Sequence, residues 1–403
     1  MVLKLLLLIA AAGTLTSTIF LGLIVVGCLR FRWLSTRKAL DAQRAKPQLP
    51  PVSVLKPLHG DEPQLRENLL SFFAQDYEAG YELLFAARSE GDAGLVLARQ
   101  LAEQYPQTSA KFVVTGEPAW PSGKIYSLYR MMEIAAHEYV IISDSDVRVA
   151  PDYLANVIPP LLDRKVGLVT CVYRGKAVGG AWSRLEALGM SVEMSAGVIL
   201  ADMLEEIKFA LGPSMSTRRE CIEKAGGVRK LADYYADDFV LGASTAAAGY
   251  KVWLSHHVID HCALHSGFRQ SIAHQVRWMR STRFSRPAGH LGTGLTFAAP
   301  FAAVAALAIP STENFWSLYL AIWNLLNPVI LAAASAWALH DKSALRFCWA
   351  YPVRNLLGFF FWIGSYAGNS IRWGAEDYEF YEDGKIRPRR RSEPRPETGT
   401  NAM

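Results

Sequence analysis

Hydrophobic residues gather at the two ends of the chain, while the middle alternates apolar and polar positions. Leu5 to Leu29 is an uncharged stretch of 25 residues, long enough to cross a bilayer as a helix. Arg30, Arg32 and Arg37 follow, and basic residues favour the cytoplasmic side of a membrane. A cleavable signal is the alternative, but the apolar run is longer than a typical signal core. We therefore predict a retained transmembrane anchor over residues 1–32.

Three more apolar segments fall within residues 291–368, namely Gly294–Ile309, Phe315–Leu339 and Phe347–Ala367. If all of them crossed together with the anchor, a cytoplasmic middle block would leave the C-terminal tail outside. The tail over residues 369–403 is basic, which favours the inside. Because the first segment is short and contains Pro300, we predict that it is re-entrant or interfacial. The tail is then cytoplasmic, and its last dozen residues have the composition of a disordered segment.

The pattern over residues 50–266 predicts strands that alternate with helices. Short apolar runs typical of buried strands are Val52–Leu55, Glu82–Ala87, Lys111–Val114, Tyr139–Ile142 and Val166–Tyr173. Helical periodicity follows Asp61-Glu62-Pro63 and recurs over Leu95–Gln104 and Ile125–Ala136. This alternation indicates an α/β domain with a mostly parallel sheet, and such sheets bind ligands beyond the carboxyl ends of their strands.

Two later segments have a different character. Leu188–Leu211 is apolar without a clean period, so it fits a core helix as well as a segment that faces lipid or covers an acceptor cleft. In Gly267–Arg286, one helical face is apolar and arginines supply positive charge. This pattern is typical of a helix in the membrane interface. We predict such a helix over residues 267–290.

Charge and cysteine content narrow the function classes. The 42 basic and 37 acidic residues give a formal net charge of +5, and the basic residues gather near the predicted membrane edges. That distribution favours anionic lipid headgroups over nucleic acid as a partner. The five cysteines are scattered without a CxxC pair. They indicate no disulfide framework, which agrees with a reducing cytoplasm.

The first candidate site is Asp144-Ser145-Asp146, directly after the strand Tyr139–Ile142. Two carboxylates at positions i and i+2 of an extended chain point to the same side. Carboxylate oxygens can hold Mg²⁺ or Mn²⁺ and leave positions for phosphate oxygens. Asp and Ser are also ordinary residues of turns that end strands, so the triplet gains weight only from its context.

A second acidic pair, Asp237-Asp238, stands near a predicted helix start. A favourable interaction with the helix dipole is the simple explanation. Together with Asp144 and Asp146, the pair supplies a carboxylate that can accept the proton of an acceptor hydroxyl. Further on, Arg277 can neutralise a departing diphosphate and Trp278 can stack on a sugar, although both residue types are common in interfacial helices.

Histidines and one cysteine cluster near the end of the soluble block, at His256, His257, His261, Cys262 and His265. Their spacing is not that of a closed four-ligand zinc site. We therefore interpret the group as a polar strand and loop that lines the active cleft.

Short motifs in a fixed order resemble those of processive and lipid-directed glycosyltransferases of the family 2 type. The resemblance is greatest to ceramide glucosyltransferases of family 21 and to bacterial relatives that glycosylate hopanoids. The matching stretches are Val52–Leu58, Phe72–Tyr77, Pro121–Lys124, Ser143–Val149, Ala236–Phe239 and Gln275–Trp278, with a family-like end at Ile371–Gly374. They span about residues 52 to 278.

The resemblance implies a GT-A fold and inverting transfer from a UDP-sugar, with glucose or N-acetylglucosamine as the sugar. The acceptor it implies is a lipid hydroxyl, of ceramide or a hopanoid, on the cytoplasmic side of the inner membrane. Asp144 and Asp146 match the metal and diphosphate site, and Asp238 matches the general base with Asp237 beside it. Lys56 and Lys124 match basic positions near the nucleotide. Gln275, Arg277 and Trp278 match the (Q/R)xxRW motif.

Two positions depart from the family pattern. Relatives often carry an Asp after the second strand to meet the nucleobase, where this chain has Arg88-Ser89-Glu90-Gly91-Asp92, and we take Asp92 for that role. His274 occupies the usual Gln or Arg place, with Gln275 one residue later. The segment Gly189–Met194 also lacks a histidine of the animal ceramide enzymes, which leaves hopanoid or another lipid open as the acceptor.

Two other functions fit parts of the pattern. A processive polysaccharide synthase shares the chemistry, but it needs a membrane channel, for which three or four spans offer little room. A membrane scaffold that only binds a nucleotide would not need Asp238.

Overall fold

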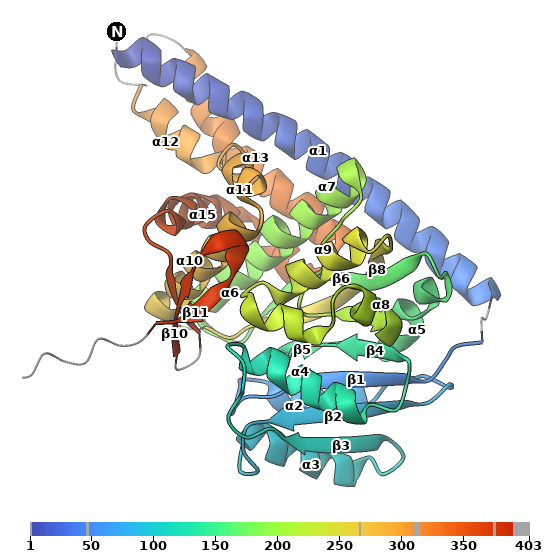
Figure 1. Cartoon of the computed structure of the whole chain (residues 1–403). Helices are drawn as coiled ribbons and strands as arrows, with labels where there is room; N and C mark the ends of the chain where they lie inside the picture. Colours follow the sequence, from blue (N-terminus) through green and yellow to red (C-terminus); the bar gives the residue numbers. More distant parts are fainter. Residues whose placement is uncertain (1, 46–47, 266, 309–314, 374–375, 390–403) are drawn as a thin grey trace, which may run out of the picture.

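A computed structural model describes residues 2–45, 48–265, 267–308, 315–373 and 376–389 (Figure 1). An eight-stranded sheet forms the centre of the middle block, in the order β3-β2-β1-β4-β7-β6-β8-β5. Its strands are β1 (Val52–Pro57), β2 (Tyr81–Ala87), β3 (Ser109–Val114), β4 (Tyr139–Ile142), β5 (Val147–Arg148), β6 (Val166–Ala177), β7 (Met215–Arg218) and β8 (Lys251–Ala263). All five predicted strands are present.

Parallel pairing dominates the sheet. Strands β3, β2, β1 and β4 run parallel to one another, and β6 runs parallel to β8. Strand β7 is antiparallel to both β4 and β6, and β5 is antiparallel to β8. The α/β class with a mostly parallel sheet is confirmed. The sequence pattern did not reveal β7, because Met215-Ser216-Thr217-Arg218 is short and largely polar.

Helices of the middle block cover the sheet as their apolar faces predict. In α2 (Leu65–Phe73), the side chains of Leu65, Leu69, Phe72 and Phe73 are all buried. The hydroxyl of Ser122 caps α4 by accepting a hydrogen bond from the Ile125 amide. The other helices of this block are α3 (Ala93–Gln104), α4 (Gly123–Ile134), α5 (Tyr153–Val157), α8 (Arg219–Lys224) and α9 (Asp237–Ala247), with 3₁₀ turns at Pro159–Leu162 and Val228–Asp233.

The apolar run after residue 188 forms part of a longer helical segment. Helix α6 (Gly180–Gly189), a π-helical turn (Met190–Met194) and α7 (Ser195–Glu205) follow one another without a break. Ser191 and Ser195 lie against β6, where their hydroxyl oxygens accept hydrogen bonds from the amides of Gly175 and Tyr173. The segment therefore packs on the sheet as a core helix does.

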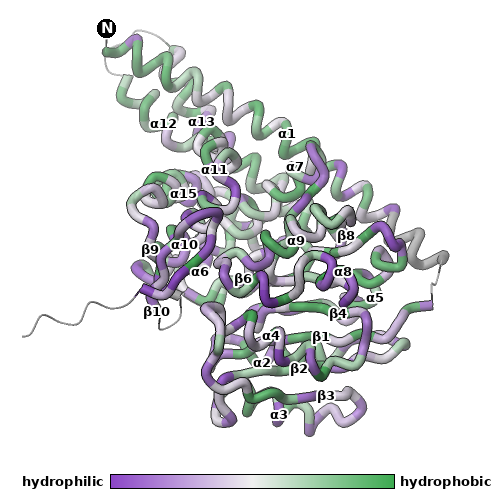
Figure 2. The backbone as a smooth tube through the Cα atoms, viewed as in Figure 1, coloured by the Kyte–Doolittle hydropathy of each residue, from purple (hydrophilic) through white to green (hydrophobic). Residues whose placement is uncertain are grey.

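The hydrophobic ends of the chain come together on one side of the molecule. Helix α1 (Val2–Ala45) runs past α12 (Ala299–Ala306) and α13 (Phe315–Ala338) in Figure 1, and Figure 2 shows all three as largely hydrophobic. Ala10, Ala305 and Ala321 form a buried cluster where the three helices meet, and small side chains there let helices approach closely. The remaining helices on this side are α14 (Lys342–Phe347), a 3₁₀ turn at Cys348–Ala350 and α15 (Tyr351–Ser365).

Three helical stretches of the described chain are long and apolar enough to cross a membrane: Val2–Arg37, Gly180–Glu205 and Phe315–Ala338. The first and third coincide with predicted spans. The second, with 61% of its most apolar window buried inside the protein, also packs on the sheet. The segment predicted to be re-entrant, Gly294–Ile309, contains the short helix α12 within its described residues. The short helix α11 (Pro287–Thr293) precedes it.

Helix α10 (Phe268–Ser285) covers most of the region predicted to be an interfacial helix, but Arg280 and Arg283 have partners in the protein. Arg280 donates to the carbonyl oxygens of Ala367 and Ser370, and Arg283 donates to that of Gly368. The segment that carries these carbonyls continues into a small antiparallel sheet. Its strands are β9 (Ser370–Trp373), β10 (Glu376–Phe380) and β11 (Ile386–Pro388), with a turn at Glu382–Gly384. The first part of the predicted tail is thus folded.

Some predicted features lie outside the described residues. They are the disordered end of the tail within residues 390–403, Gly374 of the family-like end, and Ile309 at the end of the first C-terminal apolar segment.

Candidate active site

A cavity of about 980 Å³ opens at the carboxyl ends of the central strands. Its polar end is lined by Asp144 and Asp146, which follow β4, and by Asp237 and Asp238, which begin α9. The cavity therefore lies where ligands bind in open α/β sheets, and it brings the two predicted acidic pairs together.

Lys124 joins the two acidic pairs. Its ammonium nitrogen lies 2.8 Å from Asp144 Oδ1 and 3.2 Å from Asp237 Oδ2. Burial opposes the charge on Lys124, but the neighbouring carboxylates outweigh burial and raise the pKa of its ammonium. Burial also raises the pKa of Asp144, although Lys124 opposes that shift. One fixed cation thus holds Asp144 and Asp237 side by side.

Asp146 is held by a histidine that the sequence did not identify as its partner. Asp146 Oδ2 lies 3.1 Å from His261 Nε2, and His261 comes from β8. Burial alone would raise the pKa of Asp146, but His261 holds this pKa below its usual range. The other oxygen, Oδ1, is buried and has no hydrogen-bond partner among the described residues.

These residues fit a divalent metal ion. Asp144 and Asp146 offer carboxylate oxygens of the kind that Mg²⁺ and Mn²⁺ prefer. A buried carboxylate oxygen without a partner, as in Asp146, is costly unless something charged or hydrogen-bonding meets it. His261 Nε2, next to Asp146, adds a nitrogen ligand that Mn²⁺ also accepts.

Asp238 sits opposite Asp144 across one small residue. Its Oδ2 accepts a hydrogen bond of 2.7 Å from the Gly212 amide, and its Oδ1 accepts one of 2.7 Å from the Phe239 amide. A Cβ atom added to Gly212 would lie 3.2 Å from Asp238 Oδ2 and 3.3 Å from Asp144 Oδ2. Burial raises the pKa of Asp238 to about 6, so its carboxylate is ionised at neutral pH and is also a usable base.

Lys56 lies behind the cavity and does not line it. Its side chain is fully buried and donates to the backbone oxygen of Asp144 at 2.6 Å and to the Ser143 hydroxyl at 3.3 Å. Burial lowers the pKa of Lys56 to about 7. The structure therefore gives Lys56 a role in holding the acidic turn, whereas Lys124 faces the cavity.

Glu62 supports the same turn and was not among the predicted site residues. Its Oε2 accepts a hydrogen bond of 2.6 Å from the Ser145 hydroxyl, and Glu62 lines the cavity. Burial raises the pKa of Glu62 to about 7. The sequence shows only that Glu62 precedes a helix, so its contact with Ser145 could not be predicted.

The three motif residues on α10 occupy different environments. Arg277 and Trp278 line the cavity, and Trp278 packs against the ring of His274 with centroids 4.6 Å apart. The guanidinium of Arg277 lies 6.0 Å from the ring centre of Tyr235, within reach of a cation–π contact. Gln275 is buried away from the cavity, where its Oε1 accepts a hydrogen bond from Arg354.

Asp92 lies outside the cavity lining. Its Oδ1 caps α3 by accepting hydrogen bonds from the Gly94 and Leu95 amides, and its Oδ2 accepts one from the Gly60 amide. Both oxygens are thus engaged with backbone. The contact of Asp92 with a nucleobase stays a prediction, and Arg88 is the residue of this segment that lines the cavity.

The clustered histidines do not converge on one point, as their spacing indicated. His256 stacks on Phe31, His257 lies beside Tyr153, and His261 meets Asp146. Successive residues of a strand face opposite sides, which separates neighbours along β8. Only His261, Cys262 and His265 of the group line the cavity.

The far end of the cavity is apolar. Met190, Val198 and Leu204 line it from the helical segment Gly180–Glu205, and Phe297 lines it from the loop before α12. Glu205, which pairs with Arg286, and Glu193 of the π-helical turn are charged residues in this wall. Glu193 is the more deeply placed of the two, with a side chain that is 21% exposed against 62% for Glu205. Its Oε2 forms an ion pair of 2.7 Å with Arg354, and its Oε1 is buried without a hydrogen-bond partner among the described residues.

The sheet and its covering helices form a fold of the GT-A type. A mannosyltransferase from Pyrobaculum calidifontis, solved in complex with GDP-Man and Mn²⁺, is similar in fold with a TM-score of 0.50. That match covers 89% of this chain and 99% of the other at 19% sequence identity.

The family follows from the sequence. The model of glycosyl transferase family 21 matches residues 17–386, so the chain belongs to glycosyltransferase family 21. It is 28% identical over 212 residues to ceramide glucosyltransferase 1 of Caenorhabditis elegans, covering 52% of this chain and 45% of that protein. It is also 29% identical over 132 residues to a ceramide glucosyltransferase of Komagataella phaffii, covering 32% of this chain and 25% of that protein. The matches span less than half the length of these relatives. The family match confirms the predicted resemblance to family 21 glycosyltransferases.

Proposed function

We propose that the chain is a membrane-bound inverting glycosyltransferase that moves one sugar from a UDP-sugar to the hydroxyl of a lipid. The sugar is glucose or N-acetylglucosamine, and the lipid is ceramide or a hopanoid. The observation that carries the proposal is the position of Asp238. This carboxylate lies across Gly212 from Asp144, in a cavity whose other end is apolar.

The polar end of the cavity suits the diphosphate of the donor. Asp144 and Asp146 would hold Mg²⁺ or Mn²⁺, with His261 as a further ligand, and the ion supplies charge neutralisation for a diphosphate leaving group. Lys124 and Arg277 add fixed positive charge in the cavity. Their side chains are held by the carboxylates of Asp144 and Asp237 and by the ring of Tyr235.

Asp238 is placed to act as the general base. The amides of Gly212 and Phe239 hold its carboxylate in one orientation. As the acceptor oxygen bonds to the anomeric carbon, its proton passes to Asp238 and the bond from that carbon to the UDP oxygen breaks, with its electron pair leaving on the diphosphate. Attack from the face opposite the diphosphate inverts the anomeric configuration. Trp278 beside the cavity can stack on the sugar ring.

The apolar end of the cavity suits the chain or ring system of a lipid. Its lining comes partly from Gly180–Glu205, which is long and apolar enough to meet the membrane. In this apolar wall, Glu193 Oε1 has no hydrogen-bond partner among the described residues and favours an acceptor that carries a second hydrogen-bond donor. Ceramide, with its amide, and a polyhydroxylated hopanoid both carry such a donor.

The charge distribution supports an active site on the cytoplasmic side of the inner membrane. Arg30, Arg32 and Arg37 follow the apolar part of α1, where Phe31 stacks on His256 of β8, and basic residues favour the inside. The cytoplasm also supplies nucleotide sugars. On this arrangement the lipid enters the cavity from the bilayer and the donor enters from water.

The test is mass spectrometry of lipids from a host that expresses the chain, because the added mass and the lipid backbone are read together. A single hexose or N-acetylhexosamine on one lipid class is the expected product, and the Asp238→Asn variant at equal expression is the control. Long glycan chains would instead identify a processive synthase. Unchanged lipids together with full complementation by Asp238→Asn would identify a nucleotide-binding scaffold.

A further inference from the structure

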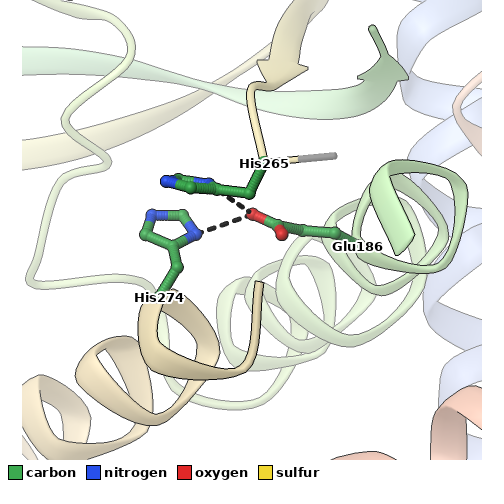
Figure 3. A group of neighbouring side chains, drawn as sticks. All are labelled: Glu186, His265 and His274. Carbon is green, nitrogen blue, oxygen red and sulfur yellow. Dashed lines mark hydrogen bonds and ion pairs between the residues drawn. The ribbon is translucent and has the colours of Figure 1, made fainter. Parts of the chain in front are cut away.

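Beside the cavity, three side chains from three different elements turn their ligand atoms toward one another (Figure 3). Glu186 comes from α6, His265 follows β8, and His274 comes from α10. One ligand atom of each lies within 4.8 Å of the others. The three residues are separated by 79 and 9 positions in the numbering of the chain, so only the fold brings them together. We call this group the Glu186 cluster.

The imidazole rings of His265 and His274 both lie close to the same carboxylate oxygen. His274 Nδ1 lies 2.6 Å from Glu186 Oε1, and His265 Nδ1 lies 3.5 Å from it. The two rings are 4.3 Å apart between centroids. The Glu186 side chain has no exposed surface, and its other oxygen accepts a hydrogen bond of 2.7 Å from the Ser271 hydroxyl. The carboxylate is therefore oriented by Ser271 on one side and presents Oε1 to the histidines on the other.

A hydrogen-bonded pair explains only part of this arrangement. One proton between His274 and Glu186 satisfies both of those groups. His265 is then left over, because its Nδ1 is buried and has no hydrogen-bond partner in the part of the chain that the structure describes. A buried polar atom without a partner is uncommon and calls for an explanation. A cation at the centre of the three ligand atoms would engage His265 as well.

We propose that Glu186, His265 and His274 bind a transition metal ion of the zinc class, separate from the ion at Asp144 and Asp146. Two imidazoles and one carboxylate form a ligand set that suits Zn²⁺, whereas Mg²⁺ prefers oxygen ligands alone. Ser271 holds the carboxylate in place, as outer partners of metal ligands commonly do. His265 and His274 line the cavity, so a water molecule can complete the coordination from that side.

Such an ion would fasten α10 to α6 and to the end of β8. His274 lies one helical turn before Trp278, and their rings are in contact at 4.6 Å between centroids. Coordination of His274 therefore fixes the start of the helix face that carries Arg277 and Trp278. The role of the ion is structural, because it holds three elements of the cavity wall together. Its presence does not depend on the identity of the sugar or the lipid.

The test is Co²⁺ binding to the purified full-length chain in detergent, with Mg²⁺ in excess to occupy the oxygen-rich site. Co²⁺ replaces Zn²⁺ in such sites and reports its ligands by visible absorption. We expect one equivalent to bind with the spectrum of a nitrogen-ligated ion, and one equivalent of Zn²⁺ to displace it. In His265→Asn, binding should weaken at least about tenfold, since even loss of an outer partner costs 10- to 100-fold.

Two matched variants locate the ion. Asp146→Ala should keep the Co²⁺ spectrum, because it removes a ligand of the other site only. His256→Asn is the same exchange at a histidine outside the cluster, on β8, where His256 stacks on Phe31. This variant should bind Co²⁺ with the affinity of the unaltered chain. Loss of the spectrum in Asp146→Ala, or equal affinity in His265→Asn and the unaltered chain, would overturn the proposal.

Thermal unfolding separates loss of the ion from loss of the fold. We expect Zn²⁺ to raise the midpoint of the unaltered chain and not that of His265→Asn, because a ligand that binds only the folded state stabilises it. With chelator present, the two midpoints should coincide. A midpoint of the unaltered chain that does not respond to Zn²⁺ would contradict the site.

Discussion

The two ends of the cavity handle polar groups in opposite ways. At the sheet end, carboxylates outnumber the fixed cations. Asp144, Asp146, Asp237 and Asp238 surround Lys124 and His261, and Glu62, Arg88 and Arg277 also line the cavity. At the helical end, the wall is mostly apolar, and its carboxylates are paired: Glu193 with Arg354 and Glu205 with Arg286. The sheet end thus needs added positive charge to balance its carboxylates. At the helical end the charged groups are already paired, and this end offers mainly space for an apolar ligand.

This difference separates the roles of the two ends. An excess of carboxylates can be relieved by a divalent ion and by the proton that a base removes. An apolar wall stabilises a ligand by excluding water, without acting on charge. Changes at the sheet end should therefore affect turnover and donor binding, and changes at the helical end should affect the lipid alone.

The largest expected effect comes from Asp238→Asn. The amide keeps the shape of the side chain but accepts no proton, so we expect kcat to fall by about 10²- to 10⁴-fold, the range for loss of a general base. Donor binding should change little because Asp144 and Asp146 are untouched. Turnover measured beside UDP binding by calorimetry checks both parts. A parallel loss of UDP affinity would show that Asp238 belongs to the donor site instead.

Asp146→Ala should have the next largest effect. It removes the carboxylate whose Oδ1 is buried without a partner among the described residues and frees His261. We expect UDP to bind at least about tenfold more weakly with Mn²⁺ present, and equally weakly to variant and unaltered chain after chelation. If the affinity of the unaltered chain for UDP does not respond to chelator, the metal assignment fails.

A smaller effect is expected at the helical end, from Gly197→Leu on α7. Gly197 lines the cavity, and a Cβ there meets nothing within 4 Å, so the new side chain narrows the cavity without a clash. Crowding of about 1–3 kcal/mol corresponds to a KM for the lipid raised about 5- to 150-fold, with UDP binding unchanged. Gly22→Leu on α1, where a Cβ also meets nothing within 4 Å, is the matched control.

The smallest effect is the pH dependence of turnover. Asp238 must be ionised to accept a proton, and burial raises its pKa to about 6. The active fraction is therefore complete well above pH 6 and is lost as the pH falls through that value. We expect kcat/KM for the lipid to be halved near pH 6, measured with donor and metal saturating. A profile that stays flat down to pH 4.5 would remove Asp238 from the role of base.

Local patterns in the sequence determined much of the fold. The strands from Val52, Glu82 and Tyr139 were predicted because a strand buried on both faces has a continuous apolar run. The helix with buried Leu69 and Phe72 was predicted because its periodicity reflects one buried face. The acidic turn at Asp144 was also predicted to lie beyond a strand end. Its meeting with Asp238 followed only from the family resemblance, since 94 positions separate the two residues.

The tertiary structure determined the side-chain contacts between residues that are distant in sequence. His261 meets Asp146, Asp92 accepts a hydrogen bond from the Gly60 amide, and Lys56 supports the acidic turn from behind. Local sequence patterns predicted none of these contacts. The arginines of α10 bind carbonyls of the C-terminal segment instead of standing free. The physical reason is that a periodic pattern records which face of an element is buried, whereas side-chain contacts are set by how separate elements pack.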